Sequence, residues 1–268
     1  ALIKQKINSI ILNDHPKNKL TTDNIEIKYI NEKLYEKFIH KIFVFTEKII
    51  KSTFLSSPRS TFTLGFFGFD ITKLAEYQLA DIIHIHWLGQ GFINFKSLKK
   101  VNKPIVWTMR DMWPFTGGSH YTMDFEKYEK NFLSQKIKKL KKKTYRGNFK
   151  FVAMSEWLKL QAEKSDVLSG HKIDKIFNNI EINNFNFVSR DEARNLLNIK
   201  TNKRIILFGA QNPQSTRKGW DILLKTLKKI DKSKYFLLLF GRFWSQNYLD
   251  EIKIEYKSLG FIDEQEKW

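Results

Sequence analysis

Arg217 and Lys218 form a pair of cations in the connection 209–219, directly before an apolar-periodic helix predicted over 220–230. The start of a helix has unpaired backbone N–H groups and the positive end of the helix dipole, and both favour an anion. Arginine grips phosphate oxygens with its planar fork and lysine adds a point charge, so the pair can neutralise a diphosphate leaving group. A solvated basic loop is the alternative, and the connection matches neither the Gly-x-Gly-x-x-Gly nor the Walker pattern.

A second group of polar residues lies between Asp81 and Tyr121, just past two short apolar strands. His84 and His86 belong to the first strand, and Arg110 and Asp111 follow the second. In an open parallel sheet, ligands bind in the crevice beyond the carboxyl ends of the strands, so we expect a site here. For Arg110 and Asp111, a structural ion pair or a cap is the alternative.

Two glycines, Gly117 and Gly118, follow the string Trp113-Pro-Phe-Thr116 in the same segment. A backbone with two glycines can turn sharply and approach a ligand closely. An ordinary turn that packs two aromatic residues explains the pair equally well.

We expect no metal and no resident cofactor. The chain has no cysteine, so disulfides and thiolate ligands are excluded and a reducing compartment is compatible. His84, His86, His120 and Asp111 could be drawn as a metal site, but the helical His-x-x-x-His spacing is absent.

Strand-like segments alternate with helical patterns along the first two thirds of the chain, which predicts a parallel sheet covered by helices. The expected strands are 9–12, 82–86, 105–108, 149–154 and 173–178. A helix is expected over 32–52, where Leu34, Phe38, Ile42 and Phe45 recur at helical spacing.

A second unit begins near Arg190, where strands expected at 204–208 and 235–240 flank a helix as a βαβ unit. We therefore predict two doubly wound domains, 1–188 and 189–268, with the second incomplete. The chain starts at Ala1 and stops at Trp268, soon after an expected strand and turn. We expect it to lack material at both ends.

The formal net charge of +19 favours a nucleic-acid or anionic-membrane partner, because clustered Lys and Arg release counterions from phosphates. A compositionally biased genome would give the same excess. The densest basic run, 136–150, predicts an amphipathic helix whose basic face is either solvated or in contact with anionic lipid. The hydrophobic share of 42% is enough for packed cores. No apolar run approaches the roughly 20 residues that span a bilayer.

Several strings together resemble bacterial family 4 glycosyltransferases of capsule and exopolysaccharide synthesis, from about Asp81 onward. The strings are Ile83-His-Ile-His-Trp87, Pro104-Ile-Val-Trp-Thr-Met-Arg-Asp-Met-Trp-Pro-Phe-Thr-Gly-Gly-Ser-His-Tyr121, Ser155-Glu-Trp-Leu158, Ile206-Leu-Phe-Gly-Ala210 and Arg217-Lys-Gly219. Their order and spacing are similar to those of the family, and the Asp-Met-Trp-Pro-Phe-Thr-Gly-Gly string is highly specific.

The resemblance implies a GT-B fold, with one Rossmann-like domain for the acceptor and another for the nucleotide sugar. It also implies retention of anomeric configuration without a bound metal. The roles that it implies are donor-diphosphate binding by Gly209, Arg217 and Lys218, catalysis by Arg110 and Asp111, and an acceptor and sugar cleft lined by His86, Gly117, Gly118 and His120. Leaving-group charge on the diphosphate is what preorganised cations would stabilise.

The chain departs from the family pattern at several points. Many relatives carry His where Arg110 stands and Cys where Ser119 stands, followed by further cysteines that are missing here. The family's glycine-rich loop would precede Ala1 and its acidic donor-binding pair would follow Trp268. We therefore expect the chain as given to be unable to catalyse transfer.

The leading hypothesis is a cytoplasmic retaining hexosyl-type transferase that moves a sugar from a nucleotide diphosphate sugar to a glycan or lipid-linked acceptor. Its basic face would contact the inner face of the cell membrane. The alternative is a non-catalytic glycan- or partner-binding module of the same fold. A nucleic-acid-binding protein is the third hypothesis, and we expect no nucleic-acid partner.

Overall fold

The computed structural model describes residues 8–13, 26–30, 33–55, 61–180, 182, 187–243 and 245–262, apart from the side chain of Asp124. The chain divides into two compact units, Ala1–Asn178 and Asn179–Trp268, whereas the sequence placed the boundary between 188 and 189. Ala1 and Trp268, the two ends of the sequence, lie outside the described residues.

The first unit is built on a four-stranded parallel sheet in the order β3-β4-β5-β6. Its strands are β3 (Ile83–Ile85), β4 (Ile105–Met109), β5 (Phe149–Ala153) and β6 (Ile173–Lys175). These are the four strands that the apolar runs predict, although β6 ends before the expected Asn178. A separate parallel pair, β1 (Ile10–Asn13) and β2 (Glu26–Tyr29), belongs to the same unit.

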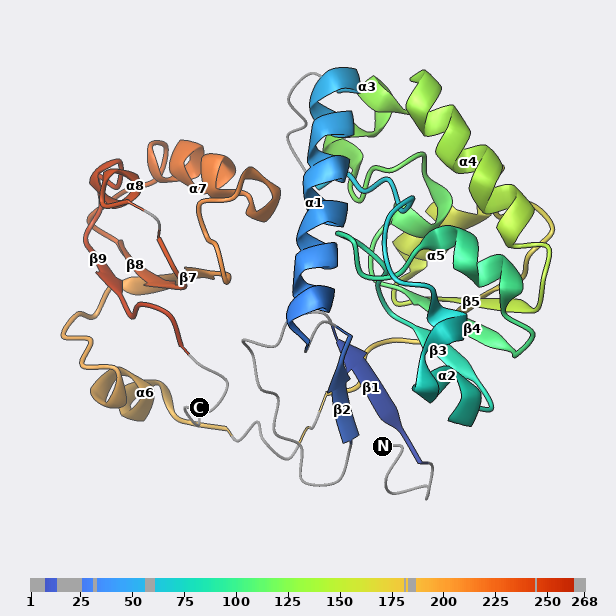
Figure 1. The fold of residues 1–268 in the computed structure, drawn as a ribbon. Coiled ribbons are helices and arrows are strands. Elements are labelled where there is room, and N and C mark those ends of the chain that lie inside the picture. The colour runs from blue at the N-terminus through green and yellow to red at the C-terminus, as the bar shows by residue number, and fades with distance from the viewer. Residues whose placement is uncertain are drawn as a thin grey trace. The chain divides into compact units, whose positions relative to one another are not determined.

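Helical elements connect and cover these strands (Figure 1). The α-helices are α1 (Leu34–Phe54), α2 (Ala75–Leu79), α3 (Phe125–Tyr128), α4 (Phe132–Thr144) and α5 (Glu156–Glu163). Shorter 3-10 turns are η2 (Ile71–Lys73), η3 (Phe95–Lys100), η4 (Trp113–Phe115) and η5 (Thr122–Asp124). Asn131 caps α4 through the Leu133 N–H, so this helix starts where a good cap precedes an apolar residue.

Aromatic rings form the centre of the first unit's core. Trp107 of β4 is 1% exposed and has four aromatic rings within 6.3 Å of its own ring centre. These rings are Phe95, Trp113, Tyr145 and Phe151. The strand that leads to Arg110 is therefore fixed on its inner face by large, rigid side chains.

Helix α1 confirms the predicted helix, but the four apolar residues whose spacing predicted it lie on its solvent-exposed side. Leu34, Phe38, Ile42 and Phe45 are 86%, 65%, 45% and 63% exposed. The inner side carries Phe43, whose ring contacts Phe69 edge to face at 5.7 Å. In the described part of the chain, no helix is both long and apolar enough to cross a bilayer.

The second unit holds a three-stranded parallel sheet, β7-β8-β9. Its strands are β7 (Arg204–Gly209), β8 (Tyr235–Phe240) and β9 (Tyr256–Ser258), and its helical elements are α6 (Arg190–Leu196), η7 (Thr216–Lys218), α7 (Trp220–Leu227) and α8 (Asn247–Asp250). The βαβ unit predicted around α7 is confirmed, and Trp220 and Leu227 anchor that helix in the core. Both units are thus Rossmann-like α/β structures with parallel sheets, as the sequence predicts.

Candidate functional site

Arg110 follows β4, and its side chain contacts residues that follow the other three strands of the first sheet. Its Nη1 donates to Oδ1 of Asn178, beyond β6, at 2.9 Å and contacts Sδ of Met154, after β5, at 3.1 Å. Its Nη2 lies 3.4 Å from Nδ1 of His86, which follows β3. Because the side chain is exposed, this edge presents a guanidinium to solvent, where ligands of parallel sheets bind.

Two histidines support the guanidinium from β3. The ring centres of His84 and His86 lie 4.2 Å apart, and Nε2 of His84 is 2.8 Å from the Thr108 hydroxyl. Burial, His84 and Arg110 lower the pKa of His86 to about 4, and burial and Arg110 also lower the pKa of His84. Both imidazoles are therefore neutral near pH 7, and Arg110 is the cation of this cluster.

Asp111, predicted to act in catalysis beside Arg110, points into the unit. Its Oδ1 accepts the Trp113 N–H at 2.9 Å, and its Oδ2 lies 2.7 Å from Nδ1 of His120. The other nitrogen of His120 is 2.9 Å from the Thr63 hydroxyl. Both carboxylate oxygens are thus occupied, so the alternative of a cap and ion pair describes Asp111 in this structure.

Gly117, Gly118 and His120 were predicted to line a cleft, but all three are buried. A Cβ on Gly117 would lie 2.4 Å from Cβ of Ser134, and one on Gly118 would lie 2.3 Å from the Phe62 ring. Gly118 also has a φ of +129°, which L side chains rarely adopt. The glycines permit close packing against Phe62 and α4, so these residues shape the loop from inside.

Lys141 of α4 lies beneath the same loop and is 1% exposed. Its Nζ donates to the carbonyl oxygens of Trp113 and Thr116, the latter at 2.9 Å, and stands 3.9 Å from the Trp113 ring centre. Burial lowers the pKa of this amine well below its ordinary value, against the opposing effect of Asp111 and Glu129.

The two carbonyls between those of Trp113 and Thr116 also accept hydrogen bonds from side chains. The Tyr145 hydroxyl donates to the Pro114 carbonyl and the Ser165 hydroxyl to the Phe115 carbonyl, each at 2.7 Å. Side-chain donors therefore reach four successive carbonyls, those of residues 113 to 116, and the Trp113 carbonyl also accepts the Thr116 N–H at 3.4 Å. The backbone on which Asp111 turns is rigidly held.

In the second unit, Arg217 and Lys218 lie exposed in η7, directly before α7. Gly219 separates η7 from α7 with a φ of +82° and lets the chain turn into the helix. The predicted position of the cation pair at a helix start is confirmed. Its binding of a diphosphate stays a prediction.

Gly209 and Arg242 mark the carboxyl edge of the second sheet. A Cβ on Gly209, at the end of β7, would lie 2.2 Å from the Phe240 ring. After β8, the Arg242 guanidinium lies 4.0 Å from the ring centre of Phe261, which follows β9. Arg242 was not singled out from the sequence, although its place just past the end of a strand is the same signal that marks Arg110.

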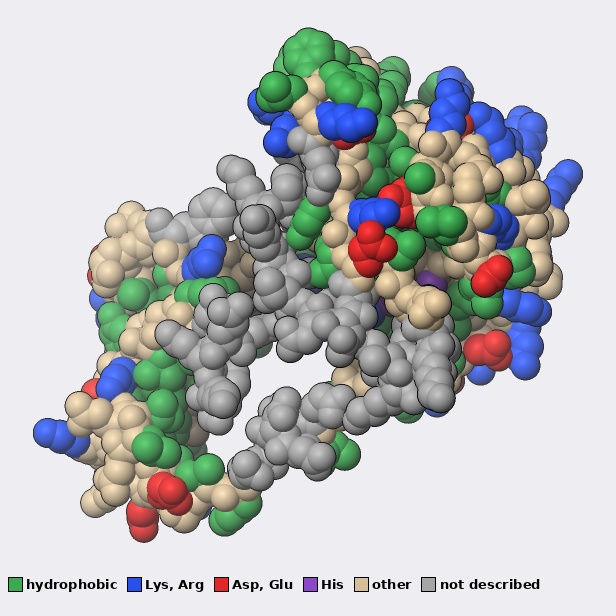
Figure 2. All heavy atoms as spheres, turned by 60° about the horizontal axis from the view of Figure 1, so that its bottom comes forward, with side chains coloured by type: hydrophobic (Ala, Val, Ile, Leu, Met, Phe, Trp, Pro, Cys, Tyr) green, Lys and Arg blue, Asp and Glu red, His purple; other side chains and the backbone are tan. Residues whose placement is uncertain are grey.

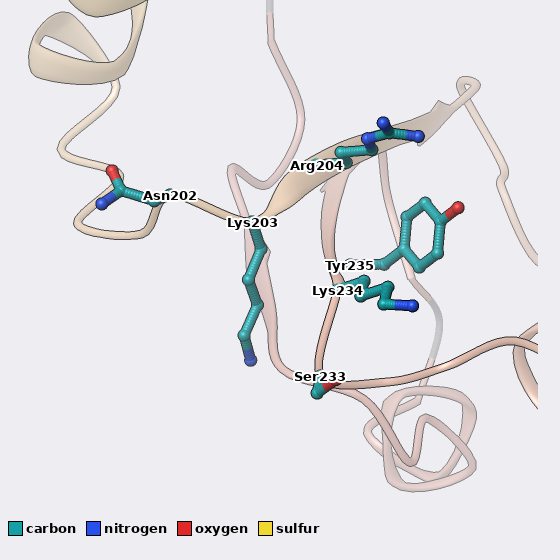
Figure 3. Close-up of a pocket in the computed structure, with 6 residues that line it drawn as sticks. All are labelled: Asn202, Lys203, Arg204, Ser233, Lys234 and Tyr235. Carbon is teal, nitrogen blue, oxygen red and sulfur yellow. The ribbon is translucent and has the colours of Figure 1, made fainter.

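A surface hollow lies at the opposite, amino ends of β7 and β8 (Figure 3). Its lining is Asn202, Lys203, Arg204, Ser233, Lys234 and Tyr235. Lys203 pairs with Glu255 at 2.8 Å, and Lys234 with Asp231 at 3.3 Å. Two of the three cations that line this hollow therefore have acidic partners.

Comparison with known proteins supports the fold. No protein-family profile matches the chain. An uncharacterised 41.2 kDa protein in the cps region of Klebsiella pneumoniae is 24% identical over 196 residues, which cover 71% of this chain and 51% of that protein. The chain thus spans about half the length of this curated relative.

Two solved structures share the fold over nearly the whole chain. A glycosyltransferase from Rickettsia africae ESF-5 superposes with a TM-score of 0.54 and 16% identity, covering 98% of this chain and 62% of that one. Anabaena Alr3699/HepE, in complex with UDP and glucose, gives a TM-score of 0.50 and 15% identity, covering 95% and 69%. The chain therefore has a glycosyltransferase-like α/β fold.

Replacing Lys141 by Met should lower the free energy of unfolding by about 2–4 kcal/mol, because two buried carbonyls lose a donor at about 1–3 kcal/mol each. The difference in unfolding free energy between the unaltered protein and the variant should grow as the pH rises towards about 10.4, the ordinary lysine pKa. Over this range the unfolded chain of the unaltered protein binds more protons at Lys141 than the folded chain, so its stability rises with pH. Urea unfolding followed by tryptophan fluorescence measures both effects. Lys139→Met, on the exposed side of α4, is the control and should change stability by less than about 0.5 kcal/mol; equal losses would contradict the bracing role.

Arg110→Gln should raise the pKa of His86 from about 4 towards its ordinary value, because a positive charge that disfavours the imidazolium is removed. NMR titration of the histidine ring protons measures this pKa. Arg146→Gln, an exposed charge change elsewhere in the same unit, should leave it unchanged. An unaltered His86 titration in the Arg110 variant would show that the two groups do not interact.

Proposed function

We propose that this protein is a glycosyltransferase of surface polysaccharide synthesis that uses a nucleotide diphosphate sugar as donor. The observation that carries the proposal is the cation pair Arg217 and Lys218 at the start of α7, at the edge of a parallel sheet where ligands bind. Support comes from the fold shared with a glycosyltransferase and with a protein crystallised with UDP and glucose, and from the cps-region relative.

In this proposal the second unit holds the donor diphosphate. Arg217 and Lys218 offer a planar fork and a point charge to the phosphate oxygens, directly before the start of α7, where the helix dipole favours an anion. Negative charge develops on the diphosphate as the sugar leaves, and fixed cations stabilise that charge without reorganising. Gly209 lets the end of β7 pack closely against the Phe240 ring at this edge of the sheet.

The first unit contributes Arg110 as the group that contacts the sugar or acceptor, with His86 beside it. A neutral imidazole accepts or donates a hydrogen bond to a hydroxyl, whereas an imidazolium only donates. Asp111 acts through the loop, because its oxygens hold Trp113 and His120 in place. Retention of configuration, a hexosyl donor and the family 4 and GT-B assignments follow from the resemblance and belong to the same proposal.

The acceptor in this proposal is a growing glycan or a lipid-linked sugar, and the protein works in the cytoplasm at the inner face of the cell membrane. The cps-region relative favours a polysaccharide context. Lipid-linked acceptors present their sugar at a bilayer surface, so a basic protein would meet them there.

A non-catalytic module of the same fold is the second candidate. It is favoured by Arg110, which stands where many relatives of the resembled family carry His. The two candidates differ in turnover. Incubating the product of the complete reading frame with labelled nucleotide sugars and a lipid extract, and measuring label in glycolipid or glycan, distinguishes transfer from binding alone.

Changing Arg217 and Lys218 together to Gln should weaken UDP binding by at least about a hundredfold, because two charge-assisted hydrogen bonds are lost at about 1.5–3 kcal/mol each. Calorimetric titration with UDP and a thermal shift under saturating UDP measure the loss. Lys228→Gln with Lys229→Gln, at the other end of α7, removes the same charge and should leave affinity within about twofold. Absence of any UDP binding by the unaltered protein would overturn the donor assignment.

A further inference from the structure

Three of the six lysines of α4 are used inside the first unit. Lys141 is buried beneath the loop, while Lys138 pairs with Glu129 at 2.8 Å and Asp166 at 3.1 Å. Lys142 also pairs with Asp166, at 2.7 Å. The other three, Lys136, Lys139 and Lys143, are exposed and have no apolar stripe of comparable length beside them on α4.

Helix α1 presents a different surface, a continuous apolar stripe along its solvent-facing side. The stripe consists of Leu34, Phe38, Ile42, Phe45 and Ile49, which are between 45% and 86% exposed. Their spacing of three and four residues places them on one face over most of the helix. At 21 residues, α1 is about 31 Å long.

The opposite side of α1 fixes the helix to the unit. His40 Nε2 lies 2.9 Å from the Gln90 carbonyl, and Phe43 packs edge to face on Phe69. Buried Glu47 accepts the Leu64 N–H at 3.0 Å. The inner side of α1 is thus anchored to the first unit, and the apolar stripe lies on the opposite, exposed side of the helix.

Three exposed lysines run beside the stripe. Lys37, Lys41 and Lys48 follow each other at four- and seven-residue spacing, which places them along one border of the apolar face. None of them forms an ion pair with the described part of the chain. The acids of α1 lie away from this border, since Glu36 binds the Lys33 N–H and Glu47 is buried.

An apolar face bordered by lysines fits the boundary of an anionic bilayer, where aromatic and aliphatic side chains enter the acyl region and lysines reach the headgroups. A second copy of this chain fits less well, because two surfaces of a chain with a net charge of +19 would bring like charges together. On the face drawn in Figure 2, hydrophobic side chains adjoin Lys and Arg side chains over the first unit.

We propose that α1 is a membrane-docking helix that lies in the surface of an anionic lipid bilayer, with Phe38 and Phe45 inserted and Lys37, Lys41 and Lys48 on the headgroups. The proposal rests on the proposed function for its purpose, since a lipid-linked acceptor is found at a bilayer. Its physical basis is the stripe and the lysine border alone.

Co-sedimentation of the whole chain with vesicles tests it. Vesicles of phosphatidylcholine mixed with phosphatidylglycerol should bind the protein, and vesicles of phosphatidylcholine alone should bind it far more weakly. Phe38→Gln with Phe45→Gln should weaken partitioning by more than about tenfold, because both side chains lose their place in the acyl region. Leu196→Gln with Ile222→Gln, two exposed apolar residues of the second unit, is the matched control and should not change it.

Lys37, Lys41 and Lys48 changed together to Gln should weaken partitioning by on the order of a hundredfold, at about 1 kcal/mol per lysine near the surface. Lys136, Lys139 and Lys143 of α4 changed to Gln give a variant of the same net charge, which should bind nearly as well as the unaltered protein. Equal losses in the two lysine variants would overturn the assignment to α1, and so would failure to bind anionic vesicles.

Sedimentation velocity tests the remaining alternative, in which a second copy of this chain covers the stripe. A dimer that dissociates in the Phe38 and Phe45 variant would show that a second copy covers the stripe and would overturn the proposal. Because no nucleotide sugar enters these measurements, their failure leaves UDP binding and transfer untouched. Conversely, a protein that docks on vesicles but does not bind UDP would retain the membrane helix and lose the proposed function.

Discussion

The loop after β4 depends on one buried amine. Lys141 lies beneath this loop and donates to the carbonyls of Trp113 and Thr116, and its Nζ stands 3.9 Å from the Trp113 ring centre. Burying a lysine costs free energy unless its donors are used, so this site exists only because the loop supplies acceptors in place of water. In return the loop is fixed, and Asp111 and His120 are fixed with it.

The carboxyl edge of each sheet carries a guanidinium. In each unit it follows a central strand, Arg110 after β4 and Arg242 after β8, and it contacts residues that follow other strands of the same sheet. The histidines beside Arg110 carry no charge near neutral pH, so that edge combines one cation with neutral hydrogen-bonding groups. The second unit adds two cations, Arg217 and Lys218, in the turn before α7.

Sequence reasoning recovered the parallel sheets, the βαβ unit and the cation pair, because strand runs and helix starts are encoded locally. The sequence alone could not show that Asp111 is used inside the unit while Arg110 is exposed. Adjacent residues at a strand end point to opposite sides, and only packing decides which of the two is buried. Lys141 was hidden among like residues, although it continues the apolar series Leu133 and Ile137 at four-residue spacing. For α1 the periodic spacing of apolar residues predicted the helix but not which side of it is buried. That side is determined by contacts with residues distant in the chain, such as Phe69 and Gln90.

The bond between Arg110 and Asn178 has a consequence for how the two halves of the chain are joined. Asn178 is the last residue of the first unit, so the guanidinium pins the point at which the tether to the second unit departs. A phosphate or hydroxyl that captures this guanidinium competes with the amide of Asn178 for the same donors. Occupancy of the edge would then release the Asn178 amide from one hydrogen bond, so that the end of the first unit would respond to a ligand bound at the other strand ends of the same sheet edge.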